Sequence, residues 1–197
     1  MLFRSTFASA LWALDTMFQF AKVGVDGVNF HMLPGSNYEL FTVSHNSTGA
    51  WQAFVHPEYY GLLMFAQAFP PGARLLATTA PAGPVKVWAT QGGDGAVRVT
   101  LINKDPAAEH DVSLSVPGAT AAGALETLQA PSVSATDGVT LGGQTFGDET
   151  TTGTLPTQST TPLVPVGSTY SVPLPAGRAA MLTIGGGGGG GIGLTQR

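Results

Sequence analysis

The sequence contains no cysteine among its 197 residues. This absence excludes disulfide bonds, thiol nucleophiles, and metal or iron–sulfur sites built on thiolate ligands. It does not fix the compartment, because many periplasmic and secreted domains also lack cysteine. The missing residue type therefore limits the chemistry of the chain without locating it in the cell.

Charged side chains are scarce as well. Asp, Glu, Lys and Arg make up 10% of the residues against 43% hydrophobic ones, and the formal net charge at pH 7 is −4. Nucleic acid and anionic membranes attract basic patches, and this composition supplies no such electrostatic footprint. We therefore exclude both as partners. Ser, Thr, Gly, Gln and Asn must cover most of the surface, as is common in secreted or envelope-associated β-rich proteins.

No apolar run reaches the ~20 residues that a membrane-spanning helix needs. The N-terminus superficially resembles a signal peptide, because Arg4 precedes an apolar run from Phe7 to Phe20. Asp15 interrupts that run, and no clear small-residue cleavage site follows Lys22. We expect an amphipathic or buried helix here, with a signal peptide as the alternative.

Helical spacing is clear at the start of the chain. Leu11, Leu14, Phe18 and Ala21 recur every three or four residues, and Phe7 lies one turn earlier. This spacing predicts a helix with one wide apolar face. Glycine follows shortly after, which is a frequent end signal for a helix.

Trp12 admits two interpretations. An indole on a helix can stack on a sugar ring, which would make it a carbohydrate contact. At helical spacing among other apolar residues, however, a tryptophan more often belongs to the core. We therefore expect Trp12 in the core.

A strand and a polar loop are predicted next. Val25 to His31 is an apolar run with β-branched and aromatic residues, and Pro34 to Tyr38 closes it as a polar loop. Pro57 to Phe69 then predicts a second helix, ended by Pro70. A strand flanked by helices is the repeating unit of parallel α/β folds, whose ligands meet the loops at the strand carboxyl ends.

Beyond Gly72 the pattern changes from helical spacing to alternation of apolar and polar residues. Short runs are separated by turns rich in Pro, Gly and Asp, which is typical of an antiparallel sandwich. The predicted strands are Arg74 to Thr79, Val85 to Thr90, Val97 to Asn103, His110 to Val116, Leu125 to Leu128, Ser168 to Leu174 and Ala179 to Ile184, with a short strand or arm earlier at Glu39 to Val43. Residues 141–165 are predicted to form a long loop.

Several stretches, taken in order, resemble one family. They are Phe7 to Asp15, Gly27 to His31, Gly35 to Tyr38, Pro57 to Phe65, Val85 to Ala89, Val97 to Lys104 and Ala179 to Leu182. Together they are similar to glycoside hydrolase family 79, the β-glucuronidase and heparanase-like enzymes. No single stretch is specific, but their order and spacing over residues 5–184 carry the resemblance.

The resemblance implies a fold and its division. In that family a (β/α)8 barrel carries two catalytic glutamates, and a β-sandwich packs against it. The fold class is then mixed α/β followed by all-β: the last helix-strand-helix elements of a TIM barrel and an antiparallel β-sandwich. The expected domains are a partial barrel at 1–72, a C-terminal β-sandwich at 73–184, and a disordered glycine-rich tail at 185–197.

The resemblance also implies a binding role for the polar loop. In the family this segment contacts the uronate carboxylate of the sugar, so the candidate substrate-binding residues are Gly35, Ser36, Asn37, Tyr38 and His31. The phenol of Tyr38 and backbone N–H groups can hold an anion without a buried cation. Ser36 replaces a glycine that family members often carry, and Tyr38 is alternatively only a structural part of the barrel rim.

The resemblance implies that the catalytic glutamates of the family lie upstream of what is Met1 here. In the sequence, no two glutamates of this chain are placed to form a catalytic pair; they are Glu39, Glu58, Glu109, Glu126 and Glu149. Retaining hydrolysis needs two carboxylates flanking the scissile bond. We therefore expect no catalytic residue and no cofactor. We also expect no metal site, because nothing in the sequence shows that the four histidines converge.

Two functions remain in view. The first is the C-terminal fragment of a uronic-acid-releasing β-glycosidase, whose partners are a glucuronide or uronic-acid-containing glycan and the missing N-terminal part of the barrel. The second is a non-catalytic carbohydrate-binding or accessory β-sandwich module. A full-length family protein is expected to be secreted or periplasmic. As a fragment, the chain is expected to leave barrel faces uncovered unless they fold back, namely Leu11, Leu14, Phe18, Leu62 and Phe65.

Overall fold

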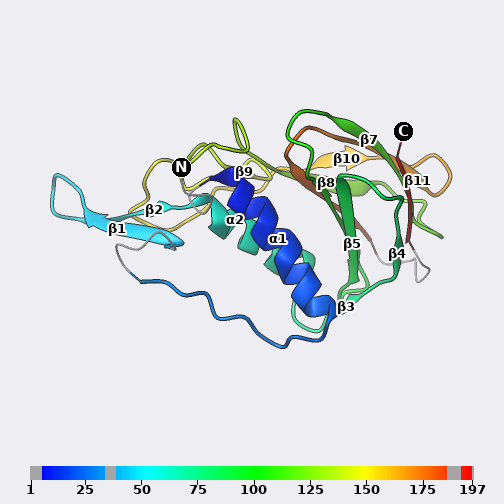
Figure 1. Cartoon of the computed structure of the whole chain (residues 1–197), viewed down its shortest axis with the longest axis horizontal. Coiled ribbons are helices and arrows are strands. Elements are labelled where there is room, and N and C mark those ends of the chain that lie inside the picture. Colours follow the sequence, from blue (N-terminus) through cyan, green and yellow to red (C-terminus); the bar gives the residue numbers. More distant parts are fainter. Residues whose placement is uncertain (1–5, 34–38, 186–191, 197) are drawn as a thin grey trace. The chain divides into compact units, whose positions relative to one another are not determined.

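The computed structural model describes residues 6–33, 39–185 and 192–196. The chain forms two compact units. The first unit takes in the residues up to Met64 together with Leu128–Ser159, and the second takes in Phe65–Thr127 and the residues from Thr160 onward. Figure 1 follows the chain through both.

Helix α1 (Phe7–Lys22) has the apolar face that the spacing predicts. Phe7, Leu14 and Phe18 are fully buried and Leu11 nearly so. The helix start is held by backbone bonds, because the N–H groups of Phe7 and Ala8 donate to the carbonyls of Ala135 and Val133 at 2.7 and 2.8 Å. Two of the helix's otherwise unpaired N-terminal donors are thereby satisfied.

One sequence expectation for α1 is wrong. Trp12 is 52% exposed and does not belong to the core. Leu11, Leu14 and Phe18 were expected to be uncovered unless they fold back, and they are buried, while Leu62 and Phe65, which share that expectation, are half-buried. The exposed apolar surface of α1 is carried by Trp12 and Phe20.

Helix α2 (Pro57–Ala68) confirms the second predicted helix. It approaches α1 very closely at Gly61, where a side-chain Cβ would lie 2.1 Å from the carbonyl oxygen of Ala10. Only a residue without a Cβ fits at that distance. Tyr60 and Met64, which lie on α2 on either side of Gly61, are buried.

The predicted buried strand from Val25 to His31 is not formed. Residues 25–33 are extended, and among the described residues no strand pairs with them. Val25, Asn29 and His31 are exposed, while Val28 and Phe30 are half-buried. A parallel strand needs a neighbour to bond its backbone groups, and the described chain provides none beside this segment.

A β-hairpin follows, formed by β1 (Phe41–His45) and β2 (Trp51–Val55). The strands pair antiparallel, with Phe41 opposite Val55 and His45 opposite Trp51. The other edge of β2 is tied to the loop at Thr150, which exchanges two backbone hydrogen bonds with Ala53 at 2.8 and 2.9 Å. Figure 1 shows the hairpin leading into α2.

The second unit is built from two sheets that share one core, which confirms an antiparallel β architecture. One sheet has the order β10-β8-β12-β6-β5-β3 and the other has the order β11-β7-β13-β4. The strands are β3 (Arg74–Leu75), β4 (Thr78–Thr79), β5 (Val85–Gln91), β6 (Val97–Asn103), β7 (His110–Ser115), β8 (Gly123–Gln129), β10 (Thr161–Leu163), β11 (Thr169–Leu174), β12 (Ala179–Ile184) and β13 (Ile192–Gln196).

The core of the second unit follows from the alternation in its strands. In β11, Tyr170, Val172 and Leu174 are buried, while the residues between them are exposed. Their ladder partners on β7 include Leu114 opposite Tyr170 and Val112 opposite Val172, and both partners are fully buried. β11 thus turns one face to the shared core and one to solvent, whereas β6 and β12 are buried along most of their length.

Two parts of the sequence prediction for the β region need correction. The tail at 185–197 was expected to be disordered, but Ile192–Gln196 forms β13, which pairs antiparallel with β7 and parallel with β4. The long loop at 141–165 is mostly irregular as predicted, but it contains β10 and the end of β9 (Thr140–Leu141). Residues 186–191 lie outside the described residues.

The units do not follow chain order. Leu128–Ser159 groups with the helices, although the sequence assigns it to the range 73–184. In the first unit, the final residues of β8 pair with β9, Leu128 opposite Leu141. The domain boundaries at 72 and 184 therefore stay a prediction.

Candidate functional site

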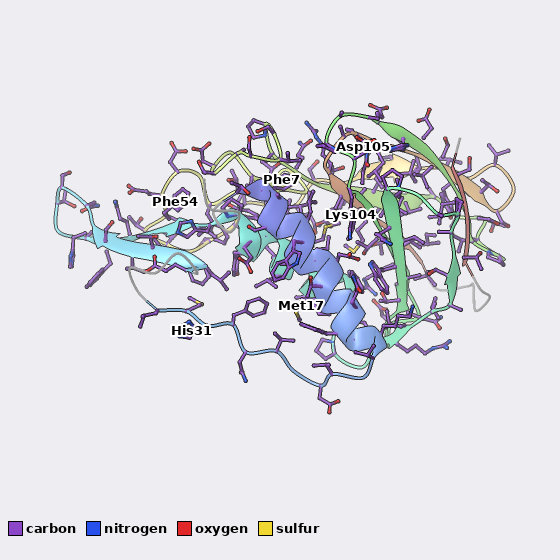
Figure 2. All side chains as sticks on the ribbon, viewed as in Figure 1. Phe7, Met17, His31, Phe54, Lys104 and Asp105 are labelled. Carbon is purple, nitrogen blue, oxygen red and sulfur yellow. The ribbon has the colours of Figure 1, made fainter. Side chains whose placement is uncertain are left out.

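Four of the five predicted substrate-binding residues, Gly35, Ser36, Asn37 and Tyr38, lie outside the described residues. The fifth, His31, is exposed and stands at the mouth of a cavity in the first unit. Figure 2 shows its position on the extended segment after α1. Its role in binding substrate stays a prediction.

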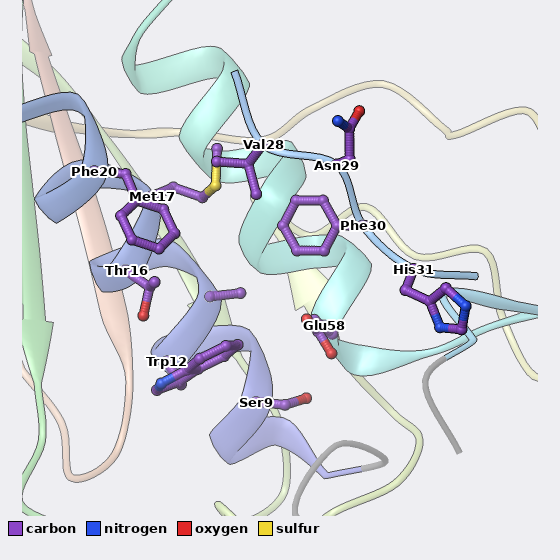
Figure 3. A pocket seen from close by; sticks show the side chains of 11 residues that line it. Ser9, Trp12, Thr16, Met17, Phe20, Val28, Asn29, Phe30, His31 and Glu58 are labelled. Carbon is purple, nitrogen blue, oxygen red and sulfur yellow. The ribbon is translucent and has the colours of Figure 1, made fainter. Parts of the chain in front are cut away.

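The cavity has a volume of about 480 Å³ and lies between α1 and the extended segment. Figure 3 shows Val28 and Phe30 turned toward the helices, while Asn29 points away from them. Such alternation is the mark of an extended backbone. The other residues that line the cavity are Ser9, Trp12, Ala13, Thr16, Met17, Phe20, His31 and Glu58.

The chemistry of this cavity is mainly apolar. Glu58 is the one carboxylate among its lining residues, and its side chain is only 8% exposed. It stands in the first turn of α2, where the helix dipole favours a negative charge. A single carboxylate beside aromatic and aliphatic side chains cannot supply both the acid and the nucleophile of a retaining glycosidase.

A polar cluster lies at the base of the hairpin, and sequence reasoning missed it. The hydroxyl of Thr42 donates to Glu39 Oε2 at 2.8 Å and lies 2.7 Å from His56 Nε2. A hydroxyl has one proton, so Thr42 must accept from His56, which fixes the proton of the neutral ring on Nε2. The sequence signal was weak, because Thr42 and His56 are 14 residues apart.

Burial holds the pKa of His56 below its ordinary value, although the nearby Glu39 carboxylate acts in the opposite direction. The neutral imidazole is thus favoured, in agreement with the hydrogen bond it donates to Thr42. The ring of Phe54 meets His56 edge-on, with 4.7 Å between ring centroids. The cluster fixes the junction between the hairpin and α2, since β2 ends at Val55 and α2 begins at Pro57.

The remaining predicted carboxylates do not gather. Glu109 and Glu149 are exposed, and Glu126 is buried in β8 of the second unit. Across the described part of the chain, no group of three or more His, Asp or Glu side chains is placed to hold a metal ion. Within the same residues, neither helix is long and apolar enough to cross a membrane.

Comparison with protein families gives one match. Residues 87–181 match the model of the glycosyl hydrolase family 79 C-terminal beta domain. This range runs from β5 to β12, so it covers most strands of the second unit. A comparison with curated proteins gives no match.

Several solved structures with a similar fold are glycoside hydrolases. A 4-O-α-L-rhamnosyl-β-D-glucuronidase from Fusarium oxysporum, solved with Rha-GlcA, has 18% identity and a TM-score of 0.72, over 92% of this chain and 40% of that one. A family 51 arabinofuranosidase from Xanthomonas axonopodis has 19% identity and a TM-score of 0.64, over 91% and 36%.

A third similar structure is a family 30 subfamily 8 xylanase from Clostridium acetobutylicum, with 14% identity and a TM-score of 0.59, over 92% of this chain and 40% of that one. The chain therefore spans about two fifths of the length of these enzymes. Identities this low establish a shared fold and no shared substrate. Over residues 87–181, the chain is similar to the C-terminal beta domain of glycosyl hydrolase family 79.

Proposed function

We propose that this chain is the C-terminal part of a retaining, β-glucuronidase-like glycoside hydrolase, and that it does not hydrolyse glycosides by itself. The match of residues 87–181 to the family 79 beta domain carries the proposal. On this account the second unit is the accessory β domain. The first unit then supplies the last helix-strand-helix elements of a (β/α)8 barrel.

The first unit supports the barrel assignment by its order and its exposure. An extended segment runs between α1 and α2, and no described strand pairs with it. Exposed apolar side chains accompany it, with Met32 at 43% and Leu33 at 58%. An extended, apolar segment without a ladder partner is what remains when a parallel barrel strand lacks its neighbours.

The predicted rim supplies the substrate preference. Gly35 to Tyr38 would bind the carboxylate of a terminal uronic acid through the Tyr38 hydroxyl and backbone N–H groups, with His31 at the edge of the same site. These neutral donors suit an anionic sugar in a chain with few cationic residues. The substrate is then a glucuronide or a uronic-acid-containing glycan, and the full-length enzyme is secreted or periplasmic.

Hydrolysis needs groups that this chain does not bring together. A retaining mechanism uses one carboxylic acid to protonate the leaving group and a carboxylate to attack the sugar, about 5–5.5 Å apart. Glu58 stands as the one carboxylate among the residues that line the described cavity. The chain therefore contributes binding surface, while the acidic pair belongs to the barrel strands of the preceding part.

An accessory carbohydrate-binding module is the second candidate, favoured by the β domain match alone. The two candidates differ in what precedes the chain, so the test is to determine the 5′ end of the transcript. An in-frame extension that encodes six or seven strand-helix repeats with glutamates at strand ends supports the glycosidase. A stop codon directly upstream, with stable protein of this length in the host, supports the accessory module.

A further inference from the structure

The β1–β2 hairpin carries an aromatic ledge that the proposed uronate rim does not use. His45 and Trp51 are direct cross-strand partners, and their ring centroids lie 3.7 Å apart with 36° between the ring planes. Val43 lies two residues before His45 on the same strand, so its side chain emerges on the same face of the hairpin. We call these three residues the hairpin ledge.

The ledge is open to solvent. Trp51 is 62% exposed and Val43 is 58% exposed, and the side chain of His45 is exposed as well. The opposite face differs, because Phe54 is half-buried there and packs edge-on against His56. A hairpin that covers one aromatic residue and exposes another presents the second one for contact.

The turn beside the ledge is held rigid. The side-chain oxygen of Asn46 accepts hydrogen bonds from the Thr48 N–H, the Thr48 hydroxyl and the Ala50 N–H at 2.8 to 3.0 Å. Gly49 completes the turn with a φ of +82°, a conformation that favours glycine. The rings of His45 and Trp51 directly flank this turn, so little conformational freedom is left to lose when a ligand binds.

The composition of the hairpin selects the class of ligand. Residues 41–55 contain no Asp, Glu, Lys or Arg, so nothing here attracts a phosphate, a nucleic acid or a charged peptide. A pyranose ring has one face of C–H groups and a rim of hydroxyls. With 3.7 Å between ring centroids, the imidazole of His45 stacks against one face of the Trp51 indole, and the C–H face of a sugar fits the other, solvent-exposed face.

We propose that the hairpin ledge is a sugar-stacking subsite that binds a neutral pyranose unit of the glycan. This inference rests on the proposed function, because the hairpin lies on the same connection between the extended segment and α2 as the predicted rim at 35–38. In (β/α)8 enzymes these connections surround the active site. The ledge then holds a neutral sugar of the same glycan whose uronic acid is proposed to bind at the rim.

The test uses the purified full chain and two probes, with binding followed by saturation-transfer NMR and calorimetry. Cellotetraose, a neutral β-linked tetrasaccharide, reports on the ledge alone, and D-glucuronic acid reports on the rim alone. Trp51→Ala is expected to weaken cellotetraose binding roughly tenfold, the loss of one aromatic stacking contact. Trp51→Phe keeps a ring and is expected to keep most of the affinity.

The matched control is Gln52→Ala, because Gln52 is the neighbour of Trp51 on the opposite face of the hairpin. It is expected to leave cellotetraose binding unchanged. Equal cellotetraose affinity in Trp51→Ala and the unmodified chain overturns the ledge, as does an absence of binding at millimolar saccharide. A change of oligomeric state in Trp51→Ala without saccharide binding also overturns it, because a second copy then covers the ledge.

The two probes separate this inference from the proposed function. If cellotetraose binding depends on Trp51 while D-glucuronic acid does not bind, the ledge stands and the uronate rim fails. If D-glucuronic acid binds and Trp51→Ala leaves cellotetraose binding unchanged, the rim stands and the ledge is rejected.

Discussion

Single residues decide how closely the helices of the first unit can approach. Gly61 on α2 faces the backbone of α1, and a Cβ there would lie 2.1 Å from the Ala10 carbonyl oxygen. No rotation of a flexible side chain relieves that contact, since both partners are backbone. Exposed glycines of the same unit lack this constraint, as Gly27 has open space around the position of a Cβ.

Gly61→Ala is expected to lower the free energy of unfolding by about 1–3 kcal/mol, because overpacking forces the helices apart. The gain in helix propensity from glycine to alanine, ~1 kcal/mol, acts in the opposite direction and is too small to compensate. Urea denaturation followed by circular dichroism measures the change. Gly27→Ala is the control and should leave stability unchanged; a Gly61→Ala protein as stable as this control contradicts the close approach.

Tyr170 is the single-residue test in the second unit. Its side chain is fully buried, and its hydroxyl donates to the Ala121 carbonyl at 2.7 Å. Tyr170→Phe removes that bond and should cost about 1 kcal/mol near neutral pH.

The pH dependence of that variant checks the same contact. Burial raises the pKa of Tyr170 above its ordinary value near 10. The unfolded chain therefore loses this proton first as the pH rises, and the stabilisation, fully present below pH 10, is lost between 10 and the folded-state pKa. Tyr170→Phe should lose less stability than the unmodified chain in this alkaline range, measured by denaturation at several pH values. Parallel stability profiles contradict the assignment.

At the scale of elements, the final strand completes a sheet. β13 pairs with β7 from Gly193 opposite Ser115 to Gln196 opposite Val112, so β7 lies between β11 and β13. Without β13, one side of β7 becomes an unpaired edge that exposes its N–H and C=O groups.

Truncation of the chain after Gly185 is therefore expected to speed amide hydrogen exchange in β7 while β6, which lies in the other sheet, keeps its protection. Exchange measured by mass spectrometry or NMR distinguishes the two strands. Unchanged exchange in β7 would mean that β13 does not pair in solution.

The helices and strands also show which parts of the fold could be predicted from the sequence alone. The apolar face of α1 was predictable because helical periodicity is local, and the strands of the β region were predictable from alternation and turn residues. The strand at Val25 to His31 was not, since a strand forms only with partners, and apolar composition does not say whether partners are present. β13 is short, contains few apolar residues and follows a run of glycines, so its sequence carried no strand signal.

The candidate site was predictable only in part. His31 was a candidate through the family resemblance; it lines a cavity, and its role in binding substrate stays a prediction. Trp12 was assigned to the core because it stands among apolar residues at helical spacing. The spacing of a single tryptophan does not decide which face of the helix it occupies. The Thr42–His56 contact could not be predicted because it joins a residue on β1 to one between β2 and α2, 14 residues further along the chain.

At the scale of the whole molecule, most of the exposed large apolar side chains among the described residues belong to the first unit. Phe20, Val25, Met32 and Leu33 are 39 to 58% exposed and come from one continuous stretch of chain. Exposed apolar side chains gathered in one segment are typical of a surface that another part of a protein covers.

The combined change of Met32 and Leu33 to Gln is expected to reduce binding of an apolar-surface dye and to leave the unfolding free energy within about 0.5 kcal/mol, as for other exposed positions. Dye fluorescence and urea denaturation are the two measurements. Equal dye fluorescence before and after the change places the apolar surface elsewhere.

The central claim is that the chain holds binding surface and a β domain but no hydrolytic centre of its own. Incubation of the purified chain with 4-nitrophenyl β-D-glucuronide tests this most directly, with released 4-nitrophenol as the readout. No release above the rate without protein is expected. Turnover by the chain alone, abolished in Glu58→Gln, would contradict it.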